Sequence, residues 1–472
     1  MVFSDPSFLF YFLPVVLALY WVGGWRKRNF FLLIVSLFFY IAGGGALVML
    51  LVASGLLTYS TALLIDRTEN ELKRKLTRGI TVSVLLACLL FWKYSEFMLI
   101  QFSQLMGSFG SQTNLTIDLI LPIAISFYTF QCISYLVDVS RREIEAEVNV
   151  STFLCYLFFF PHLLAGPVVR YKDVAQQLAT KPSKRFEAFV EFSPRFFLGL
   201  AKKVLIADQA AHLANAAFGI AGYQVQASDT LIGVVAYSIQ IYFDFSGYSD
   251  MAIALAGMFG IKFQENFRRP YSATSVTDFW RRWHISLSSW FRDYLYIPLG
   301  GNRGGSFRTY RNLVIVFALT GFWHGANWTF LTWGLVHGSA LIFERLFLKD
   351  ITLRRMFSRV IVRAWTVLVV MFGWLFFRAD NLGHASEMLG ALKGGSGFGV
   401  SQIVLAAITP QRIFWSTIGL AAFFLPAKQS FGEKLIDGES HLALRAMAVL
   451  AGLLASIYVL SSSFSPFLYF QF

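Results

Sequence analysis

Long apolar stretches, separated by short polar loops, recur along most of this chain. A helix that crosses a membrane needs about 20 mostly apolar residues, and these stretches are too long and too uniform for the alternating strands of a β-barrel. They lie near residues 7–22, 30–43, 45–65, 79–100, 115–138, 187–207, 228–260, 360–377, 402–426 and 441–461, with two interrupted stretches near 150–168 and 313–343. The pattern predicts an all-α polytopic membrane protein with roughly ten to twelve membrane-embedded helices.

The composition supports the same class of protein. Of the 472 residues, 56% are hydrophobic and only 14% are charged, whereas soluble domains carry about 25% charged residues. We find no long linker, low-complexity tract or internal repeat that would divide the chain. We therefore expect a single membrane domain over residues 1–472.

The net charge of +13 indicates topology rather than nucleic-acid binding. Basic residues gather in short loops between the apolar stretches, as cytoplasmic loops do, and the first such group is Arg26-Lys27-Arg28. The segment from Lys262 to Arg311 holds nine basic residues against three acidic ones, which places it on the cytoplasmic side. We expect a multi-pass membrane protein and no nucleic-acid partner.

Within that basic segment, the sequence predicts one continuous amphipathic helix at the membrane surface. Thr277 or Asp278 would cap its start. Large apolar residues then recur at steps of three and four, namely Trp280, Trp283, Leu287, Phe291 and Tyr294. On the other face, Arg281, Arg282 and Arg292 could meet water or anionic groups.

A histidine inside the apolar tract 313–343 is the strongest candidate for chemistry. Polar groups at membrane depth cost free energy, on the order of 3 kcal/mol when ionised, so they usually have a function. His324 lies between Trp323 and Gly325, and His284 lies on the predicted amphipathic helix. A desolvated imidazole stays neutral near pH 7 and can accept a proton during acyl transfer. Neither HExxH nor a Cys/His cluster occurs, so we expect no metal, and the lack of GxSxG argues against a serine hydrolase.

Two carboxylates lie within another apolar stretch. In the segment Asp244-Phe245-Ser246-Gly247-Tyr248-Ser249-Asp250, intramembrane acids should pair with a cation or line a path. Two interpretations remain equally open. Asp244 or Asp250 either has a structural role, meeting an arginine or a helix N-terminus from elsewhere in the chain, or contributes to the site.

Several of these motifs resemble the membrane-bound O-acyltransferases, in the branch that contains the alginate O-acetylation and teichoic-acid D-alanyl transfer proteins. The resemblance runs along most of the chain, through Met1-Val2-Phe3-Ser4, Gly166–Tyr171, Asp244–Asp250, Asp278–Tyr296, Trp323-His324-Gly325 and Phe377–Asp380. It implies a helical fold around a central tunnel, with a catalytic region at about residues 228–345. His324 matches the family's essential histidine, and His284 matches its second polar residue, which is asparagine in many relatives.

The resemblance also implies an activity. The family moves an acyl group from a cytoplasmic donor, here acetyl-CoA as a substrate rather than a bound cofactor, toward an acceptor across the membrane. We expect O-acetylation of a secreted polysaccharide of the alginate or cellulose class, completed by a separate extracytoplasmic acetyltransferase. The resemblance further implies a multi-pass protein of the bacterial cytoplasmic (inner) membrane, with membrane lipids as partners. The candidate substrate-binding residues are Arg281, Arg282, Trp323, Asn327, Asp244 and Ser246.

Two alternatives stay open. Peptidoglycan or teichoic acid could be the acceptor instead. A transporter of an acetyl donor or of a polysaccharide precursor, with no chemistry, would also use intramembrane acids and histidines.

Overall fold

A computed structural model describes residues 2–109, 115, 117, 119–182, 184–220, 224–348, 356–394, 397–425, 429–436 and 442–461. Within these residues every regular element is a helix, which confirms the all-α prediction. Four helical stretches among them are long and apolar enough to cross a membrane, namely Gly24–Arg67, Glu71–Ser108, Val360–Arg378 and Leu442–Ser461. The chain is therefore an integral membrane protein, while ten to twelve embedded helices remain a prediction.

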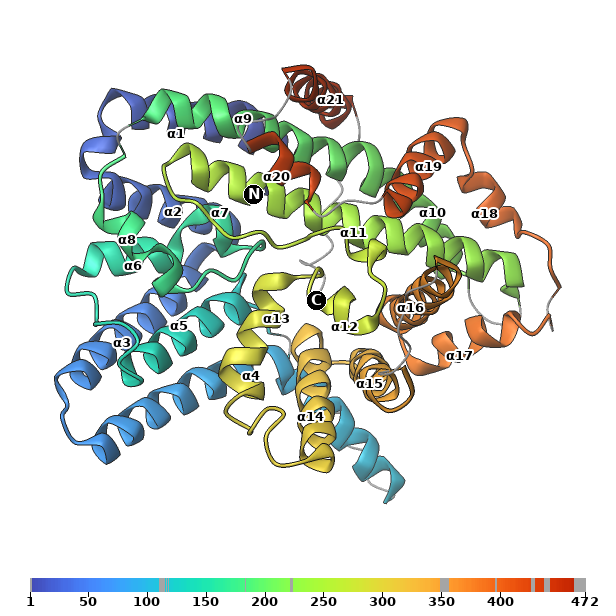
Figure 1. The fold of residues 1–472 in the computed structure, drawn as a ribbon, viewed down its shortest axis with the longest axis horizontal. Coiled ribbons are helices and arrows are strands. Elements are labelled where there is room, and N and C mark those ends of the chain that lie inside the picture. Colours follow the sequence, from blue (N-terminus) through green and yellow to red (C-terminus); the bar gives the residue numbers. More distant parts are fainter. Residues whose placement is uncertain are drawn as a thin grey trace. The chain divides into compact units, whose positions relative to one another are not determined.

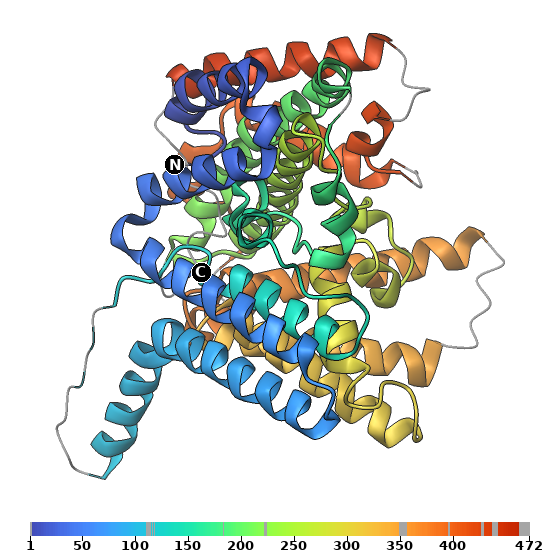
Figure 2. The same cartoon turned by 90° about the vertical axis from the view of Figure 1, so that its left-hand side faces the viewer.

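The chain forms two compact units. The first comprises residues 3–189 and 255–264. Its helices are α1 (Leu13–Val22), α2 (Arg28–Gly44), α3 (Val48–Arg67), α4 (Glu71–Ser108), α5 (Ile125–Ser140), α6 (Val150–Phe158), α7 (Phe160–Leu163), α8 (Tyr171–Ala179) and the start of α9 (Arg185–Ala201). In this unit α3 packs against both α4 and α5 (Figures 1 and 2). The predicted span 115–138 corresponds to α5, although part of its first ten residues lies outside the described residues.

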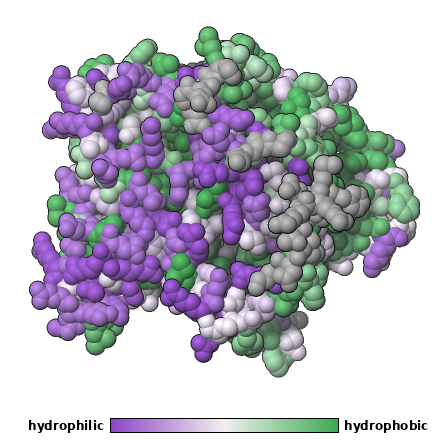
Figure 3. Space-filling view, viewed as in Figure 1, coloured by the Kyte–Doolittle hydropathy of each residue, from purple (hydrophilic) through white to green (hydrophobic). Residues whose placement is uncertain are grey.

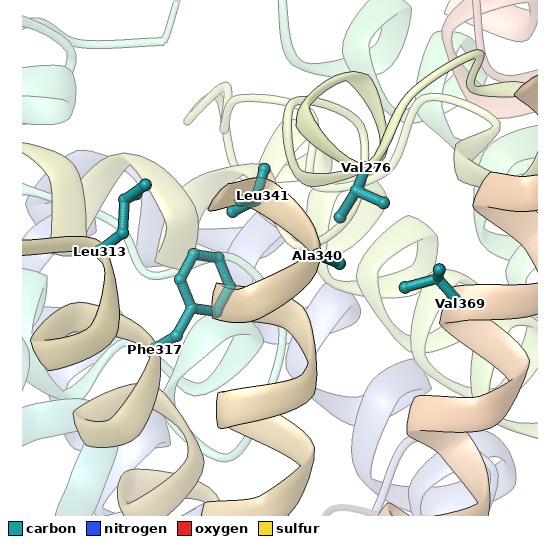
Figure 4. Packing of buried hydrophobic residues seen from close by; sticks show 6 residues of the cluster. All are labelled: Val276, Leu313, Phe317, Ala340, Leu341 and Val369. Carbon is teal, nitrogen blue, oxygen red and sulfur yellow. The ribbon is translucent and has the colours of Figure 1, made fainter. Parts of the chain in front are cut away.

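The second unit comprises residues 190–254 and 265–472. It holds the rest of α9, α10 (Asp208–Phe218), most of α11 (Ala227–Met258), α12 (Val276–Trp280), α13 (Ile285–Phe291), α14 (Ser306–His324), α15 (Trp328–Phe343), α16 (Met356–Arg378), α17 (Leu382–Ala391), α18 (Gln402–Ala407), α19 (Pro410–Phe424), α20 (Phe431–Ile436) and α21 (Leu442–Ser461). One core cluster joins α12, α14, α15 and α16 through Val276, Leu313, Phe317, Ala340, Leu341 and Val369 (Figure 4).

Large apolar side chains cover the outside of α18 and α19. Ile403, Ile413 and Phe414 are all exposed there, and this part of the surface is green in Figure 3. An exposed apolar face of this size suits contact with lipid chains rather than water.

The interrupted tract 313–343 forms a tight helical hairpin. Helices α14 and α15 lie side by side (Figure 1). Their backbones touch at two glycines, because a Cβ on Gly321 would overlap the carbonyl oxygen of Phe330 and one on Gly334 would overlap that of Phe317. The turn between the helices is residues 325–327, and Asn327 caps α15 by accepting a hydrogen bond from the Thr329 backbone NH at 3.1 Å.

The predicted continuous helix over residues 277–294 is wrong. Instead α12 and α13 are short helices separated by a break, and a π-helical turn, Arg292–Tyr296, follows. The break ends at His284, whose φ of 43° is left-handed and cannot continue a helix. The cap of α12 is Ser275 rather than Thr277 or Asp278, because the Ser275 hydroxyl accepts from the Asp278 backbone NH. The aromatic residues keep their spacing of three and four positions across the break. The break therefore cannot be recognised from the sequence pattern.

Buried ion pairs connect α9 and the π-helical turn that follows it, Lys202–Ala207, to α11. Asp250 accepts from Arg195 at 2.7 Å and from Lys202 at 2.6 Å, while Lys203 binds Asp244 at 2.7 Å. Between these pairs, Gly199 of α9 and Gly247 of α11 bring the two backbones into contact. These contacts bear on the two interpretations of Asp244 and Asp250 that the sequence left open. Each carboxylate has a basic partner, as the structural interpretation predicts.

Candidate active site

His324 lies at the last residue of α14, directly before the hairpin turn, and is 5% exposed. Aromatic rings surround its imidazole on three sides. The ring centroids of Trp323, Trp333 and Phe377 lie 4.8, 5.0 and 5.2 Å from that of His324. Gly325 is required next to it, because a Cβ there would overlap the Phe330 ring. The surroundings are therefore apolar, and they exclude bulk water from the imidazole.

A second buried histidine continues this aromatic cluster. His337 lies 5.3 Å from Trp333 and 5.1 Å from Trp280, measured between ring centroids. Its Nδ1 accepts a hydrogen bond from the Trp280 indole NH at 3.3 Å. Because a neutral imidazole has one donor and one acceptor nitrogen, the proton of His337 is on Nε2. The rings of Trp280, His337, Trp333 and His324 form one continuous row.

A cavity of about 390 Å³ begins at the other end of this row. Trp280 lines it, together with successive turns of α14 at Leu313, Phe317 and Thr320. Thr320 is one helical turn before His324, so both side chains lie on the same face of α14. The face that lines the cavity therefore leads toward the histidine.

Three arginines line the same cavity, Arg281, Arg292 and Arg345, and no acidic residue is among the described residues that line it. The cavity thus combines apolar walls with cationic groups. An elongated ligand with a phosphate-bearing end and an uncharged arm fits this combination, because guanidinium groups bind phosphate with charge-assisted hydrogen bonds.

The two arginines that the sequence singled out have different surroundings. Arg281 is exposed and lines the cavity. Arg282 does not line it, because its guanidinium binds Asp278 at 2.8 Å and the Ser272 hydroxyl at 3.2 Å. Arg281 is therefore the better placed of the two for a ligand in the cavity.

A buried carboxylate holds α12 beside the cavity. The side chain of Glu344, at the end of α15, accepts hydrogen bonds from the backbone NH groups of Val276 and Thr277 and from the Thr277 hydroxyl. The N-terminus of a helix attracts negative charge. Glu344 thereby fixes the segment that carries Trp280 and Arg281. Glu344 and Arg345 lie far along the chain from that segment, and no local sequence pattern connects them with it.

His284 has a polar environment of its own. Its Nδ1 lies 3.1 Å from the amide oxygen of Asn266, which also accepts from the Ser286 hydroxyl at 2.8 Å. Asn266 is oriented in turn, because its NH₂ group donates to the Ser249 hydroxyl. An amide oxygen only accepts, so Nδ1 carries the proton and Nε2 is the basic nitrogen. Burial lowers the pKa of His284 to about 3, which keeps the ring neutral at pH 7.

The two predicted catalytic histidines belong to one aromatic assembly, in which further rings connect them. Trp283, next to His284, lies 5.0 Å from Trp374 between ring centroids. Trp374 packs on Phe377 at 5.5 Å, and Phe377 packs on His324. The structure therefore places His284 in the same cluster as His324, with intervening rings between them.

The remaining candidates take other places. Asn327 caps α15 and donates to the carbonyl of Asp380 at 2.8 Å, so its contacts hold the turn after His324. Asp244 is bound by Lys203. Ser246 is buried, and its hydroxyl has no hydrogen-bond partner among the described residues. Trp323 packs directly on the His324 ring.

No group of three or more His, Cys, Asp or Glu side chains in the described part of the chain could hold a metal ion. The three cysteines are separate and free, with Cys132 and Cys155 buried.

The family model described as MBOAT, the membrane-bound O-acyltransferase family, matches residues 34–383, which include both histidines and the cavity. The chain belongs to this family. It is 40% identical to a probable alginate O-acetylase of Pseudomonas putida, over the full length of both chains. It is also 36% identical to a peptidoglycan O-acetyltransferase of Helicobacter pylori, over 84% of this chain and 80% of the relative. A teichoic acid D-alanyltransferase of Streptococcus thermophilus is 29% identical over 50% of this chain and 60% of the relative.

Membership of the membrane-bound O-acyltransferase family makes this chain an acyltransferase. The expected resemblance is thereby confirmed. Such an enzyme needs a donor that carries the acyl group and a hydroxyl acceptor.

Proposed function

We propose that this membrane O-acetyltransferase takes an acetyl group from cytoplasmic acetyl-CoA and moves it across the inner membrane for O-acetylation of a secreted polysaccharide. The position of His324 carries the proposal. It lies at the end of the α14 face that lines the arginine-rimmed cavity. The full-length similarity to a probable alginate O-acetylase supports a polysaccharide acceptor of the alginate class.

The donor would enter through the cavity. Arg281 and Arg345 would bind its phosphates, with Arg292, which pairs with Asp293 at 2.7 Å, beside them. The apolar wall formed by Trp280 and Phe317 would take the uncharged arm that carries the thioester. The local excess of basic residues would also attract the anionic donor to this face. Acetyl-CoA is consumed as a substrate here.

His324 would act as the general base. Its neutral imidazole would accept the proton of an acceptor hydroxyl while the oxygen attacks the thioester carbonyl. The carbon–oxygen bond forms, the carbon–sulfur bond breaks, and the imidazolium returns its proton to the departing thiolate. The aromatic rings around His324 exclude water, which would otherwise hydrolyse the thioester.

The second half of the proposal concerns the polymer. A separate extracytoplasmic acetyltransferase would complete the transfer to the polysaccharide. His284, whose Nδ1 lies beside the amide oxygen of Asn266, would support the reaction. It belongs to the same aromatic assembly as His324.

The test uses the full chain in proteoliposomes with radiolabelled acetyl-CoA. Release of free CoA should fall at least a hundredfold in His324→Ala, which is the range expected for loss of a general base. His212→Ala, at an exposed position on α10, is the matched control and should stay near the wild-type rate. Near-normal turnover in His324→Ala would refute the assignment. Uptake of intact acetyl-CoA into the vesicles without CoA release would instead identify a transporter.

A further inference from the structure

A second cavity, of about 440 Å³, lies in the first unit and plays no part in the proposed reaction. It is formed where three segments meet, namely the turn between α1 and α2, the first turn of α6, and the chain after α8. The described residues that line it are Trp25, Arg26, Lys27, Arg28, Asn29, Phe30, Asn149, Ser151, Thr152, Leu178, Ala179, Thr180, Lys181 and Pro182. The surface over α6 and α8 is mostly purple in Figure 3.

The charge of this cavity has one sign. Four of the described lining residues are basic, Arg26, Lys27, Arg28 and Lys181, and none is acidic. Among the residues the structure covers, Lys27 and Lys181 have no ion-pair partner, and both are exposed. Four cations gathered without a carboxylate repel one another, so an anion in the cavity would be strongly favoured.

Hydrogen bonds among the lining residues hold the floor of the cavity in place. Arg28 is 5% exposed, and its guanidinium donates to the Gln177 carbonyl at 2.6 Å. Asn29 donates to the Thr152 hydroxyl at 3.2 Å and to the Leu178 carbonyl at 2.9 Å. These hydrogen bonds connect α2, α6 and the end of α8, so the cavity has fixed walls.

Apolar surface begins directly beside the cationic cavity. Val22 and Leu19 of α1 are 84% and 54% exposed, and Phe30 and Ile34 of α2 are 54% and 51% exposed. α2 belongs to a stretch that is long and apolar enough to cross a membrane. These side chains are therefore placed to face lipid chains.

Two tryptophans lie where the basic cavity and the exposed apolar side chains adjoin. Trp21 is 40% exposed, and Trp25 lies in the turn under the Arg185 guanidinium, 3.9 Å from ring centroid to Cζ. Tryptophan gathers at the membrane–water interface, where lipid headgroups lie. The cavity thus sits at headgroup level, on the side that the basic loops predict to be cytoplasmic.

We propose that this cavity binds the phosphate headgroup of an anionic phospholipid. Lys27, Arg26 and Lys181 contact the phosphate, and the acyl chains extend along the exposed apolar faces of α1 and α2. A free anion would use only the cationic part of this arrangement. A phospholipid uses both the cations and the adjoining apolar surface, which is why the structure favours it.

The test is native mass spectrometry of the full chain in detergent, with phosphatidylglycerol or phosphatidylcholine added. The wild type should retain phosphatidylglycerol at least tenfold more tightly than phosphatidylcholine. The variant Arg26→Gln/Lys27→Gln/Lys181→Gln should lose this preference, because each basic group near an anionic lipid contributes measurably to binding. Lys181→Glu, a single exposed substitution, is the second variant and should weaken retention in the same direction if the triple variant does not fold.

The matched control removes three positive charges around the turn between α3 and α4, as Arg67→Gln/Lys73→Gln/Lys75→Gln. It should keep the preference for phosphatidylglycerol. Equal retention by the cavity variants and the wild type, or equal loss in the control, would overturn the proposal. Displacement of phosphatidylglycerol by millimolar inorganic phosphate or by acetyl-CoA would overturn it too, since the site would then recognise a soluble anion.

Discussion

The indole NH of Trp280 donates a hydrogen bond to Nδ1 of His337 at 3.3 Å. This bond joins α12, which carries Arg281 at the cavity, to α15, whose Trp333 packs on His324. The proposed donor cavity and the proposed base are thus connected by a partly buried hydrogen bond inside a row of aromatic rings. Disturbing it should affect both stability and transfer.

Trp280→Phe tests this contact. The substitution keeps an aromatic ring but leaves Nδ1 of His337 buried without a donor, which costs about 1–3 kcal/mol of unfolding free energy. The KM for acetyl-CoA should rise as well, because Trp280 lines the cavity. Thermal unfolding in detergent and steady-state CoA release measure the two effects. Unchanged stability and unchanged KM together would show that the contact has no such role.

Gly334→Ala tests the close approach of α14 and α15. The new methyl group would overlap the Phe317 carbonyl, so the helices must separate, at a cost of about 1–3 kcal/mol. Activity should fall by more than the loss of folded protein explains, since α14 ends at His324, directly before the hairpin turn. Gly79→Ala is the control, because nothing lies within 4 Å of a Cβ at this position in α4. If Gly334→Ala behaves like Gly79→Ala, the backbones are not in contact.

Lys203→Met separates the two roles that the sequence left open for Asp244. Removal of the lysine takes its positive charge away from the buried carboxylate of Asp244 and from Asp208, which it also binds, at a cost of about 3–5 kcal/mol. The double variant Lys203→Met/Asp244→Leu should recover much of this stability. A structural role predicts that activity recovers with it. A double variant that is stable but inactive would instead assign Asp244 to the reaction.

His284 should make stability depend on pH. Burial lowers its pKa from 6.5 to about 3, so between these values the unfolded chain binds more protons than the folded one. The free energy of unfolding should therefore fall as the pH is lowered from 6.5 toward 3. Relative to His284→Asn, the wild type should lose about 2 kcal/mol between pH 7 and pH 5. A difference between the two proteins that is constant from pH 5 to 8 would contradict a buried neutral imidazole.

The long apolar stretches of the sequence predicted the all-α class and the position of several helices. The stretch 228–260 corresponds to α11, and 313–343 to the α14–α15 hairpin with its interruption at residues 325–327. Each stretch can be recognised from neighbouring residues alone, because a helix in an apolar environment needs a certain length and an apolar composition. The break at His284 was missed because periodicity reports side-chain faces and not a single left-handed residue.

The candidate site was predictable only where one residue type is unusual for its surroundings. A histidine between tryptophan and glycine in an apolar tract is such a signal, and it identified His324. Asn266, Glu344 and Arg345 are unremarkable in their own segments. Their importance comes from contacts with residues 18 to 68 positions away along the chain, such as the Glu344–Val276 hydrogen bond.

The left-handed backbone at His284 limits which residues can replace it. At a φ of 43°, the Cβ of any residue other than glycine lies too close to the following carbonyl oxygen. Asparagine and histidine are among the few residues that tolerate this arrangement. Asparagine can therefore replace histidine here without moving the main chain, whereas valine or isoleucine cannot. The turn itself thus restricts the chemistry available at this position to a small group of polar side chains, some of which titrate near neutral pH and some of which do not.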